Sequence, residues 1–193
     1  MFKRGFKSWC ERIALEKRAD LGLRQLDKLD PYQLARHLGM KILRPDEVPG
    51  VSAACLKRLL RDDADAWSAV TLRHGSQTTI ILNTAHYPAR RSSDLMHELA
   101  HIILGHTPSR VDVTDDLQLL LRTHDRAQED EANWLSGCLL LPRPVLLHLQ
   151  RQRTEASDAA REYGVSVPMF TYRLQVSGVQ IQVRRLAAWR ASR

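Results

Sequence analysis

The chain has 193 residues, 44% of them hydrophobic, and a formal net charge of +7. This is enough apolar sequence for one compact domain with at most a small appendage. No apolar run approaches the ~20 residues that a membrane-spanning helix needs, and charged residues interrupt the stretch after the basic N-terminus, so we expect neither a membrane protein nor a secretory leader. Three widely spaced cysteines without a Cys-x-x-Cys pair predict reduced thiols and a cytoplasmic protein.

The first half of the chain alternates helical patterns with β-rich segments. We expect helices over residues 8–21, 32–38 and 53–62 and a short strand over residues 41–43. The second helix opens with Asp30-Pro31, a typical N-cap followed by proline at the first helical position. Residues 68–72 and 78–82 are rich in β-formers and are separated by a glycine-containing turn, which predicts a hairpin.

The helix predicted after this hairpin carries a metal-binding signature. It covers residues 92–105, has apolar residues at helical spacing, and includes the string His-Glu-Leu-Ala-His at 97–101. Because residues four apart share one face of a helix, His97 and His101 can direct two imidazoles at one metal ion. Glu98 can take a proton from a water molecule that the metal acidifies. The string therefore predicts a zinc-dependent hydrolase.

A second helix, predicted from Arg126 to just before Pro142, offers the third ligand that such a site needs. Glu129 and Asn133 lie four residues apart and share one face, which suits a carboxylate ligand followed by an amide that orients one of the ligand histidines. Glu131 lies about 200° away from Glu129 around the helix and is the alternative third ligand.

Two lone histidines are weaker candidates for the same position, His106 just past the first helix and His124 just before the second. A lone histidine is more often a surface residue or one with satisfied hydrogen bonds than a ligand. The segment between the two helices, residues 107–125, contains Pro108 and several aspartates. We expect it to be an irregular surface loop with one short helix.

Residues 156–178 have the pattern of a helix, a glycine turn and a second helix that Ser166 caps, which resembles a helix-turn-helix. In a DNA-binding interpretation, the second helix would place polar side chains in a DNA groove. These candidate contacts are Thr171, Tyr172, Arg173 and Gln175.

In their order along the chain, these segments resemble the ImmA/IrrE metallopeptidases of bacteria and their mobile elements. The likeness rests on the strand pair at 67–72 and 80–83, the arginine-rich lead-in at 90–96, the string at 97–101, Glu131-Ala132-Asn133, and Leu139-Leu140-Leu141-Pro142. It covers about residues 10–180. The chain departs from the family pattern at Trp134 and at Gly137-Cys138, none of which is a proposed ligand.

The resemblance implies an α+β fold. Residues 1–150 would form a mostly helical zincin-like domain, with a small antiparallel sheet packed by the active-site helix. Residues 151–193 would be a helical, helix-turn-helix-like segment packed on that domain, which makes DNA binding by this chain the less favoured interpretation. One Zn²⁺ ion per chain would be held by His97, His101 and Glu129, with Glu98 as the catalytic base.

The activity implied by the resemblance is cleavage of a helix-turn-helix repressor of the XRE type, which relieves repression in a stress or mobile-element response. The alternative is the toxin of a toxin-antitoxin pair, neutralised by a helix-turn-helix antitoxin. Either function predicts a helix-turn-helix protein as substrate or partner. We expect the substrate to pair as a strand with an edge of the sheet that contains residues 78–82.

Overall fold

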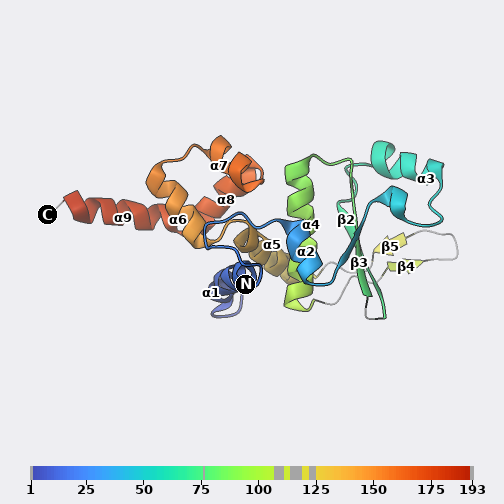
Figure 1. Ribbon diagram of the computed structural model, residues 1–193, viewed down its shortest axis with the longest axis horizontal. Helices are drawn as coiled ribbons and strands as arrows, with labels where there is room; N and C mark the ends of the chain where they lie inside the picture. Colours follow the sequence, from blue (N-terminus) through green and yellow to red (C-terminus); the bar gives the residue numbers. More distant parts are fainter. Residues whose placement is uncertain (1, 76, 107–110, 114–118, 122–124, 192–193) are drawn as a thin grey trace.

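The computed structural model describes residues 2–75, 77–106, 111–113, 119–121 and 125–191 (Figure 1). The first half contains α1 (Phe6–Asp20), α2 (Pro31–His37), β1 (Lys41–Leu43), a 3₁₀ turn at Pro45–Glu47, α3 (Ala53–Lys57) with a π-helical continuation at Arg58–Asp62, β2 (Ala69–His74) and β3 (Gln77–Leu82). These elements follow the sequence prediction closely. The carboxylate of Asp30 accepts a hydrogen bond from the backbone N–H of Tyr32, as an N-cap does.

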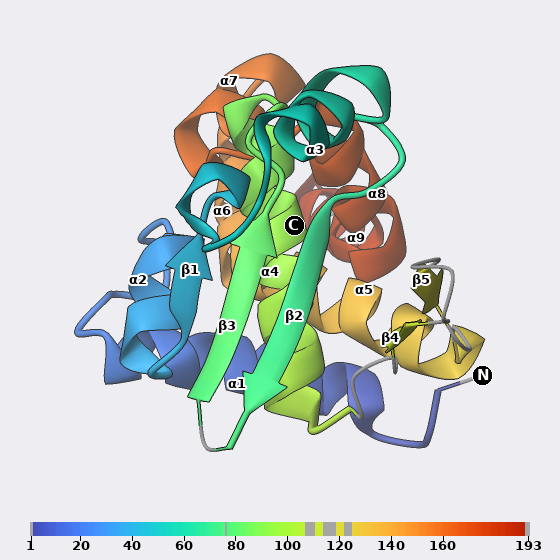
Figure 2. The same ribbon diagram turned by 90° about the vertical axis from the view of Figure 1, so that its right-hand side faces the viewer.

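The strands β1, β3 and β2 form one sheet in that spatial order. The predicted hairpin is confirmed, with β2 and β3 antiparallel from Ala69 opposite Leu82 to His74 opposite Gln77. The sheet is mixed rather than purely antiparallel, because β1 pairs with β3 in parallel. This pairing makes β3 the central strand, so it has no free edge for a substrate. In the described part of the chain, β2 is the strand of the hairpin that lies at an open edge of the sheet (Figure 2).

The helix α4 (Pro88–Leu104) packs across one face of this sheet (Figure 2). It begins one turn earlier than predicted, with Pro88 at its first position, and ends at Gly105 in the left-handed conformation, φ 69°. Its apolar face is fully buried and consists of Leu95, Met96, Leu99 and Ala100. Burial of each large side chain contributes about 1.5–3 kcal/mol, which fixes the rotation of α4 and thereby the direction of its polar residues.

The helix α5 (Arg126–Leu140) lies against α4 and continues the core. It matches the predicted second helix. Residues 132 and 134–140 are buried, whereas its first turn is half-buried or exposed. The chain between α4 and α5 differs from the prediction of a loop with one short helix, because Val111–Val113 (β4) and Leu119–Leu121 (β5) pair as antiparallel strands. The valines of the first segment favour an extended strand, and the leucines of the second are apolar as well. His124 lies outside the described residues.

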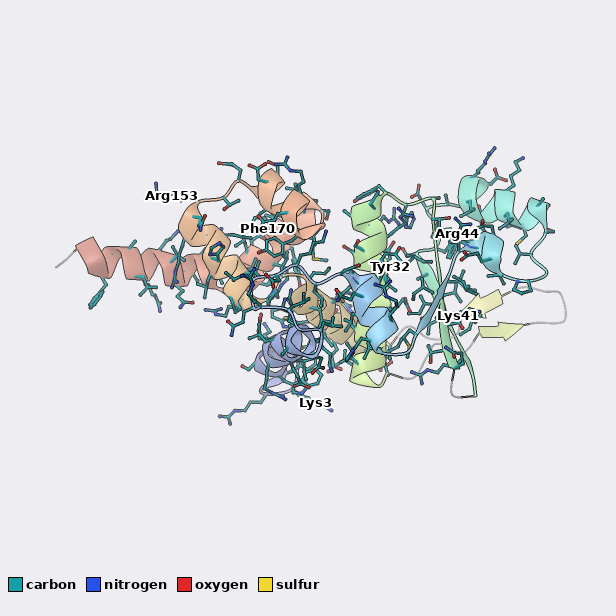
Figure 3. All side chains as sticks on the ribbon, viewed as in Figure 1. Lys3, Tyr32, Lys41, Arg44, Arg153 and Phe170 are labelled. Carbon is teal, nitrogen blue, oxygen red and sulfur yellow. The ribbon has the colours of Figure 1, made fainter. Side chains whose placement is uncertain are left out.

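The C-terminal part is helical, with α6 (Arg143–Gln152), α7 (Ala156–Tyr163), α8 (Val167–Ser177) and α9 (Val179–Ala191). Gly164 makes a left-handed turn between α7 and α8, and the hydroxyl of Ser166 caps α8, as the pattern predicted. Phe170, labelled in Figure 3, belongs to α8 and is buried. A domain boundary at residue 150, which would fall inside α6, stays a prediction.

Arg173 on α8 is a buried residue, so the prediction that it could contact a DNA groove is wrong. Only 1% of its surface is exposed. Its Nη2 donates to the Glu11 carboxylate at 2.9 Å and to the carbonyl of Leu141 at 3.1 Å. A Cβ atom at position 137 would lie 2.7 Å from Cδ of Arg173, so Gly137 leaves the space that this side chain fills.

Within the described residues, no helix is long and apolar enough to cross a membrane.

Candidate metal centre

Three side chains from α4 and α5 converge on one point. His97 Nε2 lies 3.0 Å from His101 Nε2 and 3.1 Å from Oε2 of Glu129, and His101 Nε2 lies 3.4 Å from Oε1 of Glu129. All three side chains are between 21% and 29% exposed, so a small ligand can reach them from solvent. The structure therefore brings together the two histidines and the carboxylate that the sequence singled out, with Glu129 rather than Glu131 in contact with the histidines.

The packing of α4 explains this convergence. Leu95 and Leu99 point into the core, which leaves His97 and His101 on the neighbouring face, directed toward the first turn of α5. On α5 the small side chain of Ala132 is buried completely. Because α5 packs against α4, Glu129, one turn earlier on α5, lies next to the two histidines.

The donor set and its spacing fit a zinc ion. Two ligand atoms that bind zinc tetrahedrally at about 2.1 Å lie about 3.4 Å apart, close to the three separations between these side chains. Burial, and then the nearby His97, lowers the pKa of His101 to about 4, so its imidazole is neutral at pH 7 and has a lone pair to donate. Two histidines and one carboxylate leave a fourth position for water or substrate.

Glu98 lies beside this group and is held by a residue that sequence reasoning missed. The hydroxyl of Thr71, on β2, donates a hydrogen bond of 2.5 Å to Oε2 of Glu98. Burial raises the pKa of Glu98, and the Thr71 hydrogen bond partly opposes this effect. Thr71 sits within a β-rich segment of the sequence, and no local signal marks it, because its role depends on how the sheet packs on α4.

Among the described contacts, neither Glu131 nor Asn133 reaches His97 or His101 through its side chain. Oε2 of Glu131 lies 3.3 Å from Nε2 of His106, on the far side of His101 from the convergence point. The side chain of Asn133 is exposed and makes none of the hydrogen bonds that the structure describes, so an orienting bond to a ligand histidine stays a prediction.

A groove of about 680 Å³ begins one helical turn from the ligand group. Ser93 precedes His97 by four residues on α4, and Asn133 follows Glu129 by four residues on α5, so the groove continues the face that carries the ligands. Its walls come from α4, α5, the start of α8 and the N-terminal segment. The lining residues are Phe2, Tyr87, Arg90, Ser93, Asp130, Asn133, Trp134, Ser166, Pro168, Met169 and Tyr172.

His86 anchors the first half of α4, although its position in the sequence gave no indication of a role. Its Nδ1 lies 2.9 Å from Oδ2 of Asp94, and its Nε2 lies 3.2 Å from the carbonyl of Ala64. Asp94 precedes Glu98 by one turn, so this contact ties the helix that carries the base to the loop before β2.

Comparison with known proteins agrees with the site. The profile of the M78 peptidases, described as an IrrE N-terminal-like domain, matches residues 51–175, which include α4, α5 and all three candidate ligands. Among solved structures, a Mycobacterium tuberculosis transcriptional regulator is similar in fold, with a TM-score of 0.53 and 19% identity. The match covers 89% of this chain and 47% of that one, so this chain spans about half of the longer protein. No curated protein matches the chain. Since the family profile covers well over half of its residues, the chain belongs to the ImmA/IrrE family of metallopeptidases.

Proposed function

We propose that the protein is a zinc-dependent endopeptidase that cleaves a helix-turn-helix transcriptional repressor. The observation that carries the reaction is the convergence of His97, His101 and Glu129 within 4.8 Å of one another. Glu98 is the residue after the first of these histidines, and it is the catalytic base in this proposal.

A zinc ion held by these three residues would polarise the scissile carbonyl and make water a stronger acid. The hydroxyl of Thr71 donates a hydrogen bond to Oε2 of Glu98, which leaves Oε1 to accept a proton from the attacking water. The buried setting that raises the pKa of Glu98 also helps the protonated acid to persist until it passes the proton to the leaving amine. Both proton transfers therefore use one side chain.

The open edge of β2 supports an extended polypeptide as the substrate. A strand that pairs with β2 would make backbone hydrogen bonds without regard to most of its side chains. Thr71, on the same strand, contacts Glu98 directly, so the paired segment would run past the base. Because β3 is the central strand, β2 is the edge of this sheet that we propose for substrate pairing.

The groove beside the ligands supports a substrate with large side chains next to the cleaved bond. It offers the aromatic ring of Tyr172, the thioether of Met169 and the amide of Asn133. Sites of this size, with apolar walls and a few polar groups, hold ligands by burial and orient them by hydrogen bonds.

Replacement of Asn133 by alanine is expected to lower kcat/KM about tenfold and to leave zinc affinity within about twofold of wild type, because Asn133 lines the groove and its side chain makes none of the described hydrogen bonds to a histidine. Peptide-cleavage kinetics and competition with a zinc chelator measure the two effects. An amide that orients a ligand histidine would give the opposite pattern, with zinc affinity reduced by about 10–100-fold.

A regulatory protein as substrate is supported by the family and by the fold. The similar solved structure is described as a transcriptional regulator, and the chain itself carries the helix-turn-helix-like pair α7 and α8. We propose a helix-turn-helix protein as the substrate, and the product of a gene adjacent to that of this chain is the first repressor to test.

Incubation of the purified, zinc-loaded protein with that repressor is expected to produce one defined cut, located by mass spectrometry of the fragments. A chelator should stop the cleavage and added Zn²⁺ should restore it, because in the proposed mechanism the metal ion polarises the carbonyl and acidifies the water. Cleavage that persists in the chelator would contradict the metallopeptidase mechanism, and an intact repressor beside cleavage of other proteins would contradict the proposed substrate.

A further inference from the structure

His101, His106 and Glu131 form a chain of contacts that leads away from the ligand group. Nδ1 of His101 lies 2.9 Å from Nδ1 of His106, and Nε2 of His106 lies 3.3 Å from Oε2 of Glu131. The side chain of His106 is only 8% exposed, and that of Glu131 is 25% exposed. These contacts lie on the opposite side of the His101 ring from His97 and Glu129.

The end of α4 places His106 for this contact. The N–H of Gly105 bonds to the carbonyl of Ile102 at 3.1 Å, and the N–H of His106 bonds to the carbonyl of His101 at 3.0 Å. This pair of bonds is a Schellman cap, which needs a left-handed residue, and Gly105 adopts φ 69° at no steric cost. The cap turns the chain back and brings the His106 ring against the ring of His101.

The direction of the hydrogen bonds among His101, His106 and Glu131 follows from the carboxylate of Glu131. The carboxylate of Glu131 can only accept, so Nε2–H of His106 donates to it and Nδ1 of His106 is left as an acceptor. Nδ1–H of His101 then donates to that acceptor, and Nε2 of His101 keeps its lone pair. This nitrogen is the one that faces His97 and Glu129.

We propose that His106 and Glu131 are positioning residues that fix the tautomer and ring orientation of His101, so that its Nε2 is presented to the metal. A ligand histidine whose second ring nitrogen is held in this way binds metal more tightly, because the correct tautomer and rotamer exist before the metal arrives. The inference rests on the proposed metal site, and it assigns both residues a role other than that of third ligand.

His106 is not itself a ligand in this arrangement. Both of its ring nitrogens have partners, one in His101 and one in Glu131. Asp130, which precedes Glu131 on α5, faces the groove instead and is exposed. It therefore offers a matched control, since its replacement removes the same charge from the adjacent position of the same helix.

The test measures zinc affinity by competition with a chromophoric chelator, together with the tautomer of His101 in the metal-free protein by ¹⁵N NMR. Glu131→Ala is expected to weaken zinc binding by about 10–100-fold and to mix the two His101 tautomers. Glu131→Gln should restore most of the affinity, because its amide oxygen still accepts the His106 bond. Asp130→Ala should bind zinc like wild type.

A His101 ring protonated at Nε2 in the wild-type protein would overturn the proposal, as would equal zinc affinity in Glu131→Ala and wild type. His106→Gln, whose amide oxygen can accept from Nδ1 of His101, provides a second variant, and it should keep more affinity than His106→Phe. Circular dichroism of the metal-free variants separates these effects from loss of fold. If wild type itself bound no zinc, the proposed function would fail. If wild type bound zinc and the Glu131 and His106 variants bound it equally tightly, only this inference would be overturned.

Discussion

The Glu98→Gln variant is expected to cleave the repressor about 10²–10⁴-fold more slowly than wild type while it still binds one zinc ion per chain. The amide has nearly the shape of the carboxylate and can still accept the hydrogen bond from Thr71, so the local packing is kept. It cannot accept a proton from the attacking water. Steady-state cleavage kinetics and metal analysis of the same preparation check both parts of the result.

Glu16→Gln is the matched control for this variant. Glu16 is exposed on α1, where it pairs with Arg12, so the same chemical change there should alter neither cleavage nor zinc content. Undiminished cleavage by Glu98→Gln would contradict the role of Glu98 as base. Growth arrest caused by Glu98→Gln as strongly as by wild type would favour the alternative, a toxin that acts by binding.

The histidine pair of the site could be predicted from sequence because its geometry is local. Residues 97 and 101 share a helix face whatever surrounds the helix, and the apolar pattern of α4 also gives the direction of that face. The preference for Glu129 over Glu131 rested likewise on local spacing, because Glu129 shares a face of α5 with Asn133. Their partners, however, depend on how far α5 is shifted along α4, which is a tertiary property.

Thr71 and the His106–Glu131 pair could not be found in this way. Thr71 reaches Glu98 only because β2 lies where it does in the sheet, and that position depends on β1 joining the far side of β3. Pairing between β1 and β3 joins segments far apart in the chain, whereas the hairpin is local and was predicted correctly. For the same reason, the sequence could not show which strand lies at the edge of the sheet.

The burial of Arg173 could not be predicted for a different physical reason. A polar residue on the second helix of a helix-turn-helix pattern is expected at the surface, because burial of an unpaired charge is costly. Here Glu11, from the other end of the chain, supplies the opposite charge, and Gly137 leaves room for the side chain. Neither partner is visible without the packing of α1, α5 and α8.

Replacement of Glu129 by alanine is expected to weaken zinc binding by on the order of 10³-fold or more, and with it all cleavage at ordinary zinc concentrations. The change removes one of only three protein ligands, whereas loss of a residue that orients a ligand costs about 10–100-fold. Chelator competition gives the affinities, and the visible spectrum of the Co²⁺ form reports whether the coordination changes.

Glu131→Ala is the comparison that makes the result decisive, because both variants remove one carboxylate from the first half of α5. If Glu129 is the ligand, its variant loses the larger part of the affinity and its Co²⁺ spectrum changes in kind, while Glu131→Ala keeps the wild-type spectrum at a higher metal concentration. The reverse order would make Glu131 the ligand, and α5 would then have to rotate by about 200° relative to α4. Such a rotation would expose the buried face that contains Leu135 and Leu139, at a cost of several kcal/mol. The packing of α5 is therefore the physical reason to expect Glu129 at the metal.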